Sequence, residues 1–95
     1  MRRILAICLF ALSTTKLYGA TPWIEAIKAT KHPVSRHYLI ASYWSWREAV
    51  RWHSPTNRKW ALSELAVAIE ATKRFDPANK TALQLMGQIQ QEVAK

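Results

Sequence analysis

The chain has 95 residues, 49% of them hydrophobic, and a formal net charge of +8 at pH 7. This length allows one small domain and excludes a two-domain enzyme. The hydrophobic fraction excludes a disordered tail, because such tails contain too few apolar residues to form a core.

The first twenty residues have the pattern of a secretory signal peptide. Arg2 and Arg3 precede an apolar run over residues 4–12, and the small residues Gly19 and Ala20 follow. A basic start, an apolar run and small residues before a cut are the parts of such a peptide. The run is shorter than the about 20 residues that cross a bilayer. We therefore expect a signal peptide over 1–20, and export to the periplasm or out of the cell. A buried N-terminal helix is the alternative interpretation.

Residues 21–95 would then form a single small domain without cysteine, since the one cysteine of the chain is Cys8. Disulfides, thiol catalysis and zinc–thiolate sites are excluded for that domain. A domain of this size without disulfides or a structural metal depends on a small core and has marginal stability. This is a first indication that the protein has a partner.

Prolines mark the expected helix starts, because proline lacks the N–H that would be unpaired at the first helical position. Three follow a residue with a capping oxygen, and the fourth follows a histidine: the pairs are Thr21–Pro22, His32–Pro33, Ser54–Pro55 and Asp76–Pro77. The expected helices lie near 22–30, 34–53, 56–75 and 78–94. No segment alternates as a strand does. The sequence predicts an all-α fold, a small antiparallel array of helix-turn-helix hairpins.

Helical spacing predicts which face of each long helix is buried. For 34–53 the expected face is Val34, Tyr38, Ala41, Ser45, Ala49 and Trp52, and Leu39, Tyr43, Trp46 and Val50 extend it. For 56–75 it is Leu62, Leu65, Ile69, Thr72 and Phe75. For 78–94 it is Ala82, Leu85, Met86, Ile89 and Val93.

Residues 65–89 resemble the junction between two tetratricopeptide (TPR) repeats. The matching positions are Phe75, Asp76, Pro77 and Asn79 in the turn, and Leu83, Met86 and Gly87 in the helix that follows. Gln90 departs from the family pattern, which usually has an aromatic residue there. The resemblance implies a scaffold that binds other proteins and has no catalytic activity, with Gly87 admitting a neighbouring helix at close range. Any alanine-rich helical hairpin is the alternative.

Charge and aromatic residues gather in residues 31–60. Residues 21–95 have 11 Lys and Arg against 6 Asp and Glu, a net charge of +5, and all of this excess lies in 31–60. The same segment contains the three histidines and four of the five tryptophans.

One sector of the helix expected over 34–53 combines arginines with a tryptophan. We name it the Arg/Trp face, and it consists of Arg36, Ile40, Trp44, Arg47 and Arg51. Arginine beside an indole suits anionic groups, and both residue types are enriched at binding hot spots. We predict that these five residues bind a partner; the alternative is a solvated face that keeps the protein soluble. The other four tryptophans are expected in the core.

The sequence contains no pattern of an enzyme, because it has no nucleophile beside a base, no facing carboxylate pair and no Gly-rich phosphate loop. The spacing of His32, His37 and His53 puts no two imidazoles on one turn, so we expect no metal and no cofactor. The leading hypothesis is an exported protein–protein interaction module that binds a protein partner or a second copy. The alternative is a cationic domain that docks on an anionic membrane or polysaccharide surface. Nucleic acid ranks third, because export separates the protein from it.

Overall fold

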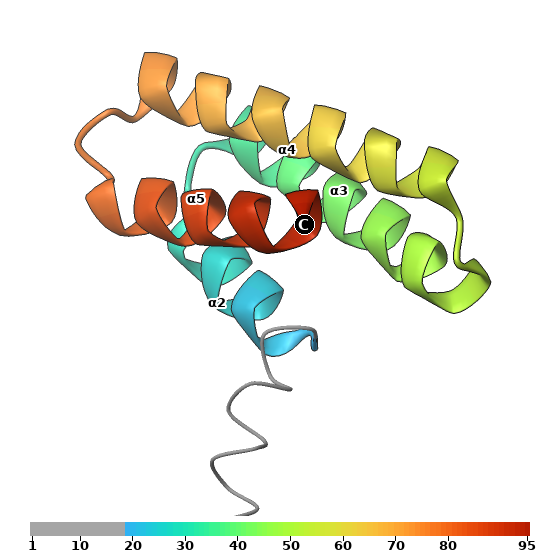
Figure 1. Ribbon diagram of the computed structural model, residues 1–95. Helices are drawn as coiled ribbons and strands as arrows, with labels where there is room; N and C mark the ends of the chain where they lie inside the picture. The colour runs from blue at the N-terminus through green and yellow to red at the C-terminus, as the bar shows by residue number, and fades with distance from the viewer. Residues whose placement is uncertain (1–18) are drawn as a thin grey trace, which may run out of the picture.

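The computed structural model describes residues 19–95, and all regular structure in that range is helical. Figure 1 shows the four helices α2 (Thr21–Ala29), α3 (Pro33–Trp52), α4 (Pro55–Phe75) and α5 (Lys80–Ala94). The predicted all-α fold is thereby confirmed. The predicted signal peptide lies outside the described residues, except for Gly19 and Ala20. Within the described range, no helix has both the length and the hydropathy of a membrane span.

Two of the expected helix starts are capped as the sequence indicates. The Ser54 hydroxyl accepts a 3.1 Å hydrogen bond from the backbone N–H of Asn57 at the start of α4. The His32 ring nitrogen Nδ1 accepts one of 3.3 Å from the N–H of Val34 at the start of α3. At α2 the N-cap is Ala20 rather than Thr21.

The start of α5 differs from the prediction. Asp76 ends α4 instead, because its backbone N–H donates to the Thr72 carbonyl over 2.8 Å. The N-cap of α5 is Asn79, whose side-chain oxygen accepts a 3.2 Å hydrogen bond from the N–H of Ala82. The short turn between the two helices therefore delays the start of α5 to Lys80.

The helices form a flat body with extents of 50 × 31 × 18 Å. In Figure 1, α3 and α4 run in opposite directions, and α5 returns along α4. The most extensive contact joins α3 to α4, while α2 packs mainly on α5 and touches α3. The core lies where the four helices meet, and its largest fully buried apolar side chains are Trp23, Leu39, Leu65 and Met86.

Small residues line the contact between α3 and α4. Ser42 is fully buried, and its hydroxyl donates a 2.6 Å hydrogen bond to the carbonyl oxygen of Ala61. One turn further along α3, the Ser45 hydroxyl donates to Glu64 Oε1 over 2.7 Å. Small side chains let two helix axes approach closely. The two hydroxyl groups are hydrogen-bonded within the contact, so burying them leaves neither hydroxyl without a partner.

The predicted face of α3 is buried only in part. The buried residues of α3 are Ser35, Leu39, Ser42 and Ala49, of which Leu39 and Ala49 were predicted, whereas Val34, Tyr38, Val50 and Trp52 of the predicted face are exposed. The buried side lies between the six residues of that face and the four that extend it. Hydrophobic periodicity missed Ser35 and Ser42 because they are polar.

The predicted faces of the last two helices are closer to the structure. In α5, Ala82, Met86, Ile89 and Val93 are buried and Leu85 is partly buried, as expected. In α4, Leu65 and Thr72 are buried, but Phe75 is 55% exposed and stacks on the His32 ring, with 4.8 Å between ring centroids.

The expected role of Gly87 is also wrong. A Cβ atom built at this position meets no atom within 4 Å, so no helix of the described chain approaches it closely.

Candidate functional site

The Arg/Trp face lies on the solvent side of α3. Arg36, Trp44, Arg47 and Arg51 are exposed, and Ile40 is half-buried. At about 100° per residue, Trp44 lies almost opposite the buried serine face of the helix. The structure thus brings the five predicted residues together on one accessible surface.

Two arginines of this face lie over indole rings. The guanidinium carbon of Arg47 is 5.0 Å from the centroid of the Trp44 ring, and it also lies 5.7 Å from that of Tyr43. One turn later, Arg51 lies 4.9 Å from the ring centroid of Trp52. Such cation–π contacts hold a planar cation and a flat apolar surface side by side.

Trp52 belongs to this surface, although the sequence placed it in the core. Its side chain is 62% exposed, and its indole N–H donates a 2.8 Å hydrogen bond to Glu48 Oε1. The spacing Glu48–Trp52, one helical turn, is the signal that could have identified it.

The arginines of the face have no carboxylate partners in the part of the chain that the structure describes. The two salt bridges there join Lys73 to Glu70 at 3.6 Å and Lys95 to Glu92 at 3.2 Å, both outside α3. The guanidinium groups of Arg36, Arg47 and Arg51 are therefore free to bind an external anion.

The five tryptophans divide differently from the prediction. Trp23 is 2% exposed and Trp46 is partly buried against it, as expected for core residues. Trp52 and Trp60 are 62% and 58% exposed, so their predicted core placement was wrong. Trp60 lies on the outer side of α4, because the small residue Ala61 next to it faces α3.

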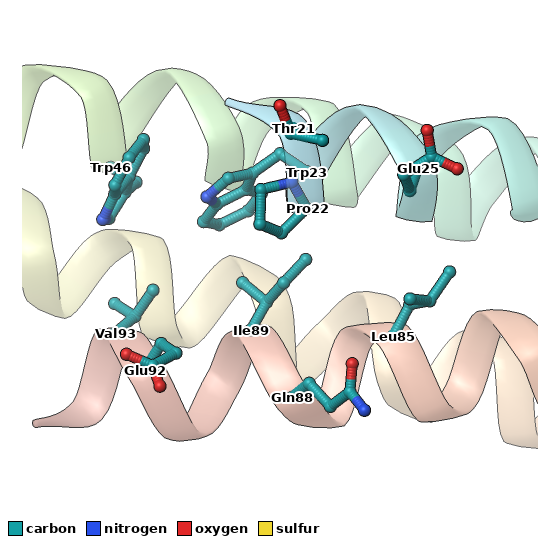
Figure 2. A pocket seen from close by; sticks show the side chains of 10 residues that line it. All are labelled: Thr21, Pro22, Trp23, Glu25, Trp46, Leu85, Gln88, Ile89, Glu92 and Val93. Carbon is teal, nitrogen blue, oxygen red and sulfur yellow. The ribbon is translucent and has the colours of Figure 1, made fainter. Parts of the chain in front are cut away.

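A cleft between α2 and α5 is a second feature, which the sequence did not indicate. We name it the α2/α5 cleft; its volume is about 250 Å³. In Figure 2, Val93 lies opposite Trp46, Ile89 opposite Trp23 and Leu85 opposite Glu25, and Glu92 lies at the Val93 end of the row. Residues of α2, α3 and α5 line the cleft. No local pattern in the sequence predicts that these three helices come together.

A more open hollow of about 510 Å³ adjoins the cleft where α5 ends. It shares Trp46, Glu92 and Val93 with the cleft, and its other charged or titratable residues are His53, Arg58 and Lys95. Arg58 also donates from Nε to the carbonyl oxygen of Val93 over 2.7 Å, which ties the end of α5 to α4.

Possible metal ligands do not cluster within residues 19–95. No group of three or more His, Cys, Asp or Glu side chains there is placed to hold a metal ion. Comparison with protein-family models, curated proteins and solved structures finds no match to this chain.

Proposed function

We propose that the protein is an exported helical interaction module that binds an acidic surface of another protein through the Arg/Trp face. The observation that supports this best is the pair of arginines stacked on exposed indoles without a carboxylate partner in the described chain. Tryptophan and arginine dominate hot spots, because they combine a large apolar area with directional polar groups.

The charge of the Arg/Trp face favours a different protein over a second copy. A two-fold dimer formed through this face would place the same surface on both sides of the interface. Three arginines would then oppose three arginines, and like charges across an interface are costly. An acidic partner instead neutralises them.

The TPR-like resemblance is a further part of the proposal. The turn from Asp76 to Asn79 supports it, because both residues make hydrogen bonds that shape the junction between α4 and α5. The small size of the chain supports the same conclusion. Stacked helical repeats usually need about three units to bury a continuous core, and exposed apolar side chains such as Trp60 and Val67 remain on this one.

Charge reversal with a matched control tests the proposal. The test variant is Arg47→Glu/Arg51→Glu. The control is Lys73→Glu/Arg74→Glu, which changes the net charge equally at two exposed residues of α4. Immobilised protein would capture partners from the envelope and secreted fractions of its source cells, and mass spectrometry would quantify each one.

We expect a partner that the wild type and the control retain and that the test variant loses by about tenfold or more, since each charged hydrogen bond contributes about 1.5–3 kcal/mol. Trp44→Ala should weaken the same partner. Equal capture by test variant and wild type would exclude the Arg/Trp face as the binding surface.

A second candidate function is docking on an anionic membrane or polysaccharide surface. The exposure of Trp44 and Trp52 beside arginines favours it, because indoles suit the headgroup region and guanidinium groups suit phosphate. Vesicles with and without phosphatidylglycerol, sedimented with the protein over a salt series, would discriminate. Binding that requires the anionic lipid and disappears both at high salt and in Arg47→Glu/Arg51→Glu supports docking, whereas indifference to salt and lipid charge excludes it.

A further inference from the structure

The charges of the α2/α5 cleft are opposite to those of the molecule as a whole. Its charged lining residues are Glu25 and Glu92, two of the six acidic residues in the chain. No lysine, arginine or histidine is among the described residues that line it. In a protein with a net charge of +8, this is a local site for a cation rather than an anion.

Glu92 is incompletely satisfied where it borders the cleft. Its Oε2 atom accepts from Lys95 Nζ at 3.2 Å, and the side chain is 20% exposed. Its Oε1 atom is buried and has no hydrogen-bond partner within residues 19–95. Removing a carboxylate oxygen from water without a compensating donor is unfavourable, so a ligand N–H that reaches Oε1 lowers the energy of the group.

The walls of the cleft are apolar and aromatic. The ring centroids of Trp23 and Trp46 lie 5.6 Å apart, and Ile89 and Val93 of α5 face them (Figure 2). An apolar cavity of about 150 Å³ is enough for benzene. A volume of about 250 Å³ therefore accommodates one ring with a short chain. Indoles also attract an ammonium group through their negative faces.

We propose that the α2/α5 cleft binds an organic ammonium group on an apolar stem. The stem lies between the indoles and α5, and the ammonium group lies toward the Glu92 carboxylate. The same chemistry is offered by a free aromatic amine and by a lysine side chain flanked by apolar residues in a polypeptide. This site is separate from the Arg/Trp face, and neither proposal depends on the other.

The experiment compares three probes that have the same phenylethyl stem and polar groups of different charge. Phenethylamine, 2-phenylethanol and 3-phenylpropionate would each be titrated into the purified protein, with the indole N–H resonances of Trp23 and Trp46 followed by NMR. The variants are Glu92→Gln and, as a matched control, Glu70→Gln. Glu70 is the other glutamate that pairs with a lysine three residues later, and it lies on exposed α4 surface.

We expect the amine to bind at least about tenfold more tightly than the alcohol, as a charge-assisted contact in an enclosed site does, and the acid to bind weakest. Glu92→Gln should abolish most of the preference for the amine over the alcohol while retaining the binding of the alcohol, and Glu70→Gln should change neither. Retained alcohol binding shows that the variant is folded.

A second arm identifies the source of the ligand. If the peptide acetyl-Phe-Lys-Phe-amide binds more tightly than phenethylamine, the natural ligand is a polypeptide. If phenethylamine binds more tightly than the peptide, the natural ligand is a free amine. Equal affinity for amine and alcohol, a preference that survives Glu92→Gln, or no shift of either indole resonance at millimolar amine would each overturn the proposal. None of these results depends on the Arg/Trp face.

Discussion

Ser42 donates a hydrogen bond of 2.6 Å to the carbonyl oxygen of Ala61, and the pair joins α3 directly to α4. Both residues are fully buried. Because neither side chain is large, α3 and α4 contact each other here through a hydroxyl group and the backbone, beside the hydrophobic core that contains Leu39 and Leu65.

Ser42→Leu should therefore lower the free energy of unfolding by about 1–3 kcal/mol, because the added carbons force the helices apart. Ser42→Ala loses only the hydrogen bond and should cost about 0.5–1.5 kcal/mol. Urea unfolding followed by circular dichroism measures both. Ser63→Leu, on the exposed side of α4, is the control and should change stability by less than about 0.5 kcal/mol. Equal effects at the two serines would contradict the close contact.

Gly87→Ala should stabilise the protein. The added Cβ meets no atom within 4 Å, and glycine inside a helix is about 0.5–1 kcal/mol less favourable than alanine. The thermal unfolding midpoint should rise. If it falls, a neighbouring segment packs on Gly87 as the TPR-like resemblance implies.

Asn79 joins three parts of the chain. Its amide nitrogen donates to the carbonyl oxygen of Ala29 at 2.8 Å and to Asp76 Oδ2 at 3.1 Å, while its oxygen caps α5. Asn79→Ala should cost about 1–2 kcal/mol, the range of a lost N-cap. Asn79→Ser keeps a capping oxygen and loses the reach to Ala29, so it should cost less overall. Hydrogen exchange separates the two effects: both variants should speed exchange in α2, but only the alanine variant should speed it at the start of α5.

Truncation should lower the free energy of unfolding strongly at Trp23 and hardly at all at Trp60. Trp23 is 2% exposed, and Trp23→Ala should cost about 3–5 kcal/mol through a cavity at the centre of the core. Trp60 is 58% exposed, and Trp60→Ala should stay within about 0.5 kcal/mol. Because Trp23→Ala alone can unfold so small a domain, Trp23→Phe provides a milder variant that still reports the direction. Similar unfolding midpoints for Trp23→Phe and the wild type, with a large loss for Trp60→Ala, would reverse the assignment.

The sequence predicts the helical elements of this fold well, because proline and capping residues act locally. Ser54 and Pro55 begin α4 through interactions within one turn, and these follow directly from residue type. The burial of α5 was also predictable, since its apolar residues outnumber the polar ones on a single face.

Hydropathy predicted the orientation of α3 only in part: Leu39 and Ala49 are buried as expected, but Ser42 was missed. The contact with α4 requires a small side chain at this position, and the polarity of serine hides that requirement. The Arg/Trp face was identified correctly as exposed because its arginines indicate the solvent side of the helix, which lies opposite the buried serines. Trp52 and the α2/α5 cleft were missed, because indole exposure and the meeting of three helices depend on tertiary packing.

The bond from Asn79 to Ala29 spans 50 residues, and this has a consequence for the order of events during synthesis. Synthesis proceeds from the amino end, so α2 is made first. Asn79, which donates the hydrogen bond to the end of α2, is made much later. Nine residues of helix do not persist alone in water. The helix α2 therefore gains its stable helical conformation only when synthesis is almost finished.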